Sequence, residues 1–226
     1  YDEVKLVVMQ NLRVDNALRD LKPRFVKNKE LTYDFHDGLT FDGGNEFHKF
    51  DAKSFRYRTE DIHRIEEQGG LYHVYLAPDR PTAYMQYSFE NDINGKFLIQ
   101  NDEMEVPHLE SDYAMVHFSV PVEAMFGNGR LYVFGQLSGW IPHPDFAMEY
   151  DPSTMSYRLS KLLKQGYYNY AYVWKAAHAD TGGYDEVMGN HSETENDYTI
   201  LVYFSDRSSF ADRLVAVKTV NSIKGQ

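Results

Sequence analysis

The segment whose spacing comes nearest to a chemical site is the polar run around His191. His191, Glu193 and Glu195 are two residues apart, so an extended chain would place their side chains on one face. Imidazole and carboxylate groups on one face can form a ligand set for a transition metal. The same run also fits a polar loop whose Asn and Thr side chains bond the local backbone. We favour the loop and expect no metal and no other cofactor.

Motifs of other common active sites are missing from the sequence. It has no Gly-rich phosphate loop after a strand, no His-Glu-x-x-His and no Gly-x-Ser-x-Gly. It has no cysteine, which excludes disulfides, thiolate metal sites and a cysteine nucleophile. Among 34 Asp and Glu residues no catalytic pair can be named, because such pairs are defined by their separation in space. We therefore expect no catalytic residues and no enzyme; carboxylates in a cleft between two domains are the alternative.

An aromatic constellation in the second half of the chain suggests sugar binding. A strand ends at Gly135, a short loop delivers Trp140, and Gly166 opens a Tyr-rich strand that runs to Trp174. This order resembles the early-set β-sandwich modules of the glycogen-binding type, in which a flat indole stacks on a sugar ring. The candidate glycan-stacking residues are Trp140, Tyr170 and Trp174.

The sequence departs from these modules in the next loop. Glycan-binding members place a second Trp there, but residues 181–188 contain only Tyr184. The alternative is that Trp140 and the alternating tyrosines are core and sheet-face residues. A carbohydrate-binding module that uses Trp140 therefore stands as one functional hypothesis, with a glycan as its partner.

The elements that must position these residues are short β-strands. In most apolar stretches, apolar and polar residues alternate at period two, and Tyr, Phe and Val are frequent. The predicted strands cover residues 4–9, 71–76, 115–120, 131–134, 167–174, 198–204 and 213–220. Clusters of Gly, Asn and Pro between them favour turns. Only two short segments, residues 16–21 and 61–67, are predicted as helical.

The chain length of 226 residues allows one large domain or two small ones. Residues 101–111 are acidic, contain Pro107 and separate two strand-rich blocks. We predict an all-β fold of two β-sandwich domains. Residues 1–105 would form an N-terminal β-rich domain, and residues 106–226 an early-set immunoglobulin-like β-sandwich.

The charge and hydropathy of the chain restrict its partners. The formal net charge of −11 repels phosphate backbones, so we expect no nucleic acid partner. No apolar run approaches the roughly 20 residues of a membrane-spanning helix, so we expect no membrane span. The first residues do not resemble a signal peptide, and we expect the chain to be a trimmed piece of a longer protein.

Five longer runs carry a resemblance that extends over essentially the whole chain. They are Leu21–Val26, Gly43–Phe47, Tyr72–Leu76, Lys164–Tyr170 and Gly189–Tyr203. With these runs the chain resembles the type IX secretion system plug protein family. The most specific run begins with a motif of unknown role, formed by Gly189, Asn190, His191, Glu193, Thr194, Glu195 and Asn196.

The resemblance implies a partner and a compartment but no chemistry. Members of this family are periplasmic, non-enzymatic proteins that sit on the inner mouth of an outer-membrane translocation barrel and close it. By resemblance we expect the same function, the periplasm as compartment, and a native signal peptide and an upstream β-sandwich outside this sequence. A reversible plug needs a specific protein interface, and exposed Tyr or Phe residues would supply its anchors.

Overall fold

The protein is an all-β fold, as the sequence predicts. The computed structural model describes residues 3–34, 38–103, 110–179, 181–205 and 211–223. Its strands are β1 (Val4–Gln10), β2 (Phe25–Lys27), β3 (Glu30–Thr32), β4 (His48–Asp51), β5 (Ile62–Gln68), β6 (Leu71–Leu76), β7 (Phe97–Ile99), β8 (Tyr113–Pro121), β9 (Gly129–Phe134), β10 (Glu149–Asp151), β11 (Ser156–Lys164), β12 (Gly166–Ala176), β13 (Asp197–Phe204) and β14 (Arg213–Asn221). Two short 3-10 helices, η1 (Gln136–Ser138) and η2 (Pro144–Phe146), follow β9. Within the described residues, no helix has the length and apolar character needed to cross a bilayer.

The chain forms two compact units whose limits differ from the predicted domains. Unit 1 comprises Tyr1–Gly43 and Glu195–Gln226, and unit 2 comprises Gly44–Thr194. The boundary predicted between residues 105 and 106 lies outside the described residues, but the strands on both sides of it belong to unit 2. Across that position β6 pairs with β8, and β7 pairs with β12. The prediction of domains 1–105 and 106–226 is corrected accordingly, because backbone hydrogen bonds join the two blocks in shared sheets.

Unit 1 is built from both ends of the chain. Its sheet has the order β1-β13-β14, and both pairings are antiparallel. β1 pairs with β13 from Val4 opposite Phe204 to Gln10 opposite Tyr198. β2 and β3 form a separate hairpin. The predicted helix at residues 16–21 is not present, and Leu18 forms an isolated bridge with Val8 instead.

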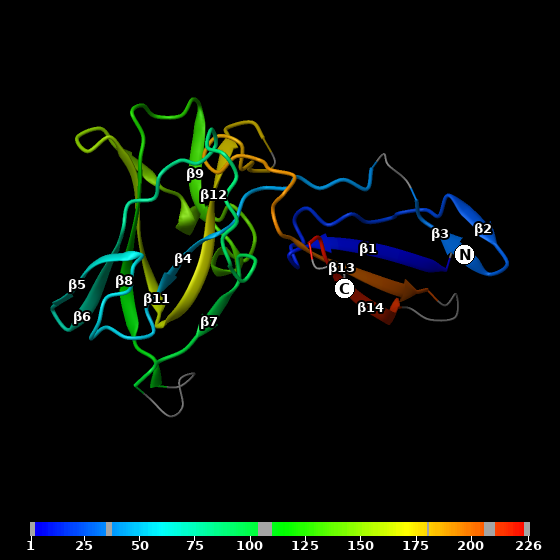
Figure 1. Cartoon of the computed structure of the whole chain (residues 1–226), viewed down its shortest axis with the longest axis horizontal. Helices are drawn as coiled ribbons and strands as arrows, with labels where there is room; N and C mark the ends of the chain where they lie inside the picture. The colour runs from blue at the N-terminus through cyan, green and yellow to red at the C-terminus, as the bar shows by residue number, and fades with distance from the viewer. Residues whose placement is uncertain (1–2, 35–37, 104–109, 180, 206–210, 224–226) are drawn as a thin grey trace. The chain divides into compact units, whose positions relative to one another are not determined.

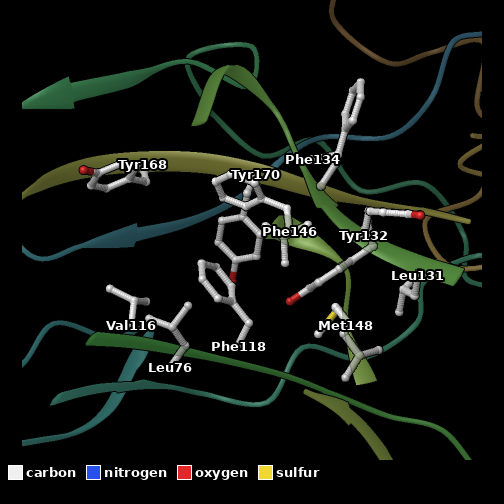
Figure 2. Packing of buried hydrophobic residues seen from close by; sticks show 14 of the residues in the cluster. Leu76, Val116, Phe118, Leu131, Tyr132, Phe134, Phe146, Met148, Tyr168 and Tyr170 are labelled. Carbon is white, nitrogen blue, oxygen red and sulfur yellow. The ribbon is translucent and has the colours of Figure 1, made fainter. Parts of the chain in front are cut away.

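Unit 2 is a sandwich of two sheets. The first has the strand order β10-β11-β8-β6-β5, with a parallel pair at β6 and β8 (Figure 1). In the second, β12 pairs with β4, β7 and β9. The aromatic residues of both sheets fill the space between them. Figure 2 shows Phe118 of β8 and Tyr170 of β12 pointing toward one another, and their ring centroids are 5.1 Å apart.

The same hydrophobic core extends around Trp140. The loop that carries Trp140 follows η1, and the indole makes edge contacts with Phe47 and Phe134. Gly95 packs against the Trp140 and Phe47 rings. A Cβ atom added to Gly95 would lie 2.4 Å from the Trp140 ring and 2.5 Å from the Phe47 ring, and the backbone φ of Gly95 is +72°. Both the lack of a side chain and the left-handed backbone are therefore required at this position.

We expect Gly95→Ala to destabilise unit 2 more than Gly70→Ala does. Gly70 has a similar φ of +80° but no atom within 4 Å of an added Cβ, so it isolates the cost of the backbone. That backbone cost is about 1–2 kcal/mol, and overpacking against two buried rings adds about 1–3 kcal/mol. Urea unfolding of both variants measures the difference. Equal losses would show that the rings move aside freely.

Candidate functional site

The predicted sugar-stacking residues are buried. Trp140, Trp174 and Tyr170 are 7%, 7% and 1% exposed. Trp174 contacts Phe126 and Tyr157 edge to face. The prediction that these three rings form a glycan-stacking surface is wrong, because stacking needs an open ring face. They are core residues, which was the alternative that the sequence left open.

His191, Glu193 and Glu195, whose spacing left a metal site as the alternative to a polar loop, do not form a ligand set. Among the described residues, no group of three His, Cys, Asp or Glu side chains is placed to hold a metal ion. Glu193 accepts a hydrogen bond from Ser192, and Glu195 accepts one from Asn221 at 2.7 Å. The imidazole of His191 lies beside the Tyr87 ring at 5.7 Å. These side chains serve local structure at the place where the chain passes from unit 2 to unit 1.

The chain passes between the units twice, at residues 43–44 and at residues 194–195. The Gly189–Asn196 motif, at the second passage, is hydrogen-bonded to Gly43 and Gly44 at the first. Within unit 2, the Gly44 carbonyl accepts hydrogen bonds from the His191 N–H at 2.8 Å and from the Thr194 hydroxyl at 3.0 Å. The Gly44 N–H donates to Asn190 Oδ1 at 3.0 Å. Gly189 has φ +83°, and its N–H donates to the Tyr184 carbonyl. Two runs that carry the family resemblance, one at Gly43–Phe47 and one at Gly189–Tyr203, are thus one hydrogen-bonded structure.

Asn196 does the same within unit 1. It is 3% exposed, its Nδ2 donates to the Gly43 carbonyl at 3.0 Å, and its Oδ1 accepts from Asn11 at 2.8 Å. A buried side-chain amide is tolerated in a folded protein when its polar atoms are hydrogen-bonded, as they are here. The residues of the motif that make these hydrogen bonds therefore have a structural role.

A cleft in unit 2 contains a buried polar network that the sequence did not indicate. The cleft has a volume of about 250 Å³ and is lined by His48, Asp61 and Asp79 among others. Asp79 Oδ2 accepts from the Tyr170 and Tyr172 hydroxyls at 2.7 and 2.6 Å, and Asp79 Oδ1 lies 3.3 Å from His48 Nδ1. Burial and the Asp79 carboxylate raise the pKa of both tyrosines well above their ordinary value. Burial also raises the pKa of Asp61.

A row of polar and aromatic side chains crosses the outer face of the five-stranded sheet. Arg64 lies opposite Tyr75, Tyr75 opposite His117, and His117 opposite Ser160. The Arg64 guanidinium lies 4.2 Å from the Tyr75 ring centroid, and the Tyr75 and His117 rings stack at 4.2 Å. We call these four residues the outer-face row. Period two in the sequence places single residues on this face, but the row depends on strand pairing that one sequence does not reveal.

The edge of the unit 1 sheet is an exposed apolar strand. In the described part of the chain β14 has one strand partner, β13, and seven of its nine residues are exposed. Leu214, Val215 and Val217 are among the exposed apolar side chains, and Val217 is 56% exposed. Long apolar edge strands of this kind are templates for pairing with another chain.

Comparison with known proteins gives a structural relative without an assigned function. No protein-family model matches the chain, and no curated protein matches it. The chain is similar to the crystal structure of a hypothetical protein from Parabacteroides merdae ATCC 43184, with 30% sequence identity and a TM-score of 0.90. The match covers 97% of this chain and 55% of that protein, so the chain spans about half the length of its relative.

We expect the tryptophan emission to be blue-shifted and insensitive to added glucans. Both indoles are buried, so acrylamide should quench their emission only weakly. In the Trp174→Phe variant the emission comes from Trp140 alone, so its quenching can be measured separately. Strong quenching of Trp140 that a glucan suppresses would contradict the burial described above.

The stability of the protein should fall as pH rises above about 10. The folded-state pKa values of Tyr170 and Tyr172 lie above those of the unfolded chain, so the folded protein retains protons that the unfolded chain releases. Each such group makes the free energy of unfolding fall by up to about 1.4 kcal/mol per pH unit. Tyr172→Phe should remove one such contribution from the slope, measured by urea unfolding between pH 9 and 11. Tyr84→Phe, at a fully exposed position, should leave the slope unchanged.

Proposed function

We propose that this protein is a non-enzymatic periplasmic interaction protein that binds and closes the inner mouth of an outer-membrane translocation barrel. The resemblance to the type IX secretion plug family supplies the partner and the compartment. The observation that carries an interaction role is the exposed β14 edge of unit 1. A strand from the partner would add to this edge by backbone hydrogen bonds, with Leu214, Val215 and Val217 available for side-chain contacts.

The distribution of charge supports this choice of surface. Unit 1 has 11 Lys and Arg against 12 Asp and Glu, whereas unit 2 has 12 against 22. Almost all of the net charge of −11 therefore belongs to unit 2. A nearly neutral unit with an apolar edge experiences little electrostatic repulsion when it approaches another protein. The acidic unit favours partner surfaces that are positively charged.

The sandwich of unit 2 is proposed to be of the early-set immunoglobulin-like type. Two features support this assignment. The loop from Gly135 to Trp140 follows β9, and Gly166 begins the aromatic strand β12, in the order that the resemblance requires. In this proposal Trp140 fills the core of the module and the edge of unit 1 makes the contact with the partner.

The proposal is tested with a purified type IX translocation barrel in a planar lipid bilayer. We expect micromolar protein added on the periplasmic side to lower the conductance, and Val217→Lys to weaken this effect at least about tenfold, since a lysine on an edge strand opposes strand addition. Met125→Lys is the matched control, because Met125 is 62% exposed and lies in unit 2.

The two variants separate the parts of the proposal. A barrel that conducts equally with and without the wild-type protein would reject the plug function. Closure that Val217→Lys leaves intact would reject the β14 edge as the contact while keeping the barrel as the partner.

A further inference from the structure

The outer-face row borders a groove whose lining differs in charge from the rest of unit 2. The groove has a volume of about 460 Å³, within the range of small-molecule sites. Its lining consists of His63, Arg64, Tyr75, Leu76, Pro78, His117, Phe118, Ser119, Arg158, Leu159 and Ser160. None of these described residues is acidic, although unit 2 as a whole has 22 acidic residues against 12 basic ones. The cleft at Asp79, in contrast, is lined by four carboxylates.

Two half-exposed guanidinium groups contribute positive charge to the groove. Arg64 Nε lies 3.2 Å from Glu66, and an Arg158 terminal nitrogen lies 3.4 Å from Asp151. Arg158 Nε also donates to the Ser156 hydroxyl at 3.1 Å. Each guanidinium has five N–H donors, so these contacts leave several of them available. Stacking against Tyr75 also holds the Arg64 guanidinium in a defined position.

The centre of the groove offers hydrogen-bonding groups beside apolar walls. His117 Nδ1 lies 2.7 Å from the Ser160 hydroxyl, and its Nε2 lies 2.9 Å from His73 Nδ1. The half-buried Tyr75 ring and the exposed Pro78 belong to the lining around them, whereas the side chains of Leu76 and Phe118 are buried in the core. A ligand in this groove would therefore meet positive charge, hydrogen-bonding partners and apolar surface together.

We propose that this groove binds the carboxylate of a small organic acid or of an acidic sugar residue. The carboxylate would lie at Arg158 and the His117–Ser160 pair, with Arg64, on the other side of Tyr75, adding positive charge to the groove. The body of the ligand would lie against Tyr75 and Pro78. Guanidinium groups are the preferred partners of carboxylates because their hydrogen bonds are charge-assisted and often bidentate. This site is independent of the β14 edge, which belongs to the other unit.

The arrangement also makes binding depend on pH. Burial, His73 and Arg64 hold the pKa of His117 below its usual range, so His117 is neutral in the free protein at neutral pH. A bound carboxylate would favour the protonated imidazole, and binding would take up a proton. The other charged or titratable groups around it are His63, Arg64 and Glu66 of β5, His73 and Tyr75 of β6, and Arg158 of β11. Affinity should therefore rise as pH falls from 8 to 6.

Isothermal titration calorimetry of the whole chain tests the site with four probes: benzoate, glucuronate, an oligoglucuronate and glucose. We expect saturable binding of at least one acid and none of glucose, which lacks the carboxylate of glucuronate. Tighter binding of the oligoglucuronate than of glucuronate identifies an acidic glycan as the source of the carboxylate. Equal or weaker binding identifies a free organic acid. No saturable binding of any of the three acids would overturn the proposal.

Variants then assign the residues. We expect Arg64→Gln and Arg158→Gln each to weaken binding of the acid at least about tenfold. His117→Gln should abolish the increase in affinity between pH 8 and pH 6. Arg130→Gln removes an exposed arginine elsewhere in unit 2 and should change neither result. Equal effects of Arg64→Gln and Arg130→Gln would show a general charge effect and would overturn the assignment to this groove.

Discussion

The fold of unit 2 depends on one strand, β12, which pairs with three others and is buried over most of its length. Its first part pairs with β4 and β7, and its second part pairs with β9. Tyr168, Tyr170, Tyr172 and Trp174 alternate along it and supply ring after ring to the core. A strand this buried must satisfy each tyrosine hydroxyl, because an unpaired buried hydroxyl is costly. Asp79 meets this requirement for two of them, and the Lys164 carbonyl meets it for Tyr168.

The strands could be predicted where period two is undisturbed, and the failures have physical causes. The segments at residues 71–76 and 115–120 alternate and form β6 and β8, and in residues 167–174 every second residue is a buried aromatic of β12. Residues 61–67 look helical because Ile62 and Ile65 are three positions apart. A register shift between Ile62 and Arg64 in fact inserts one residue into β5, so both isoleucines reach the buried side of a strand. The predicted domain boundary is wrong because the acidic segment at residues 101–111 lies between strands that pair in the same sheets. Composition alone cannot show this pairing.

The candidate surfaces could be predicted less well than the strands. An aromatic residue in a loop has the same sequence signature whether it faces water or the core, and Trp140 is covered by residues from distant segments such as Phe47 and Gly95. The groove beside His117 collects residues from β5, β6, β8 and β11. The residues of the Gly189–Asn196 motif could be named from the sequence. Their role needed the structure, because their partner, Gly44, lies about 150 residues earlier in the chain.

The assembly of unit 1 from both chain ends has a consequence for the order of folding during synthesis. Every contact between β1 and β13 spans most of the chain, so this sheet cannot form until the last strands have left the ribosome. Unit 2 is continuous in sequence and can fold before them. Once it has folded, Gly44 and Thr194 are held together by a hydrogen bond of 3.0 Å, so the entropy of closing that loop has already been lost. The β1–β13 pairing then resembles a local hairpin closure on a preformed base, and an early-synthesised β1 must stay unpaired until its partner arrives.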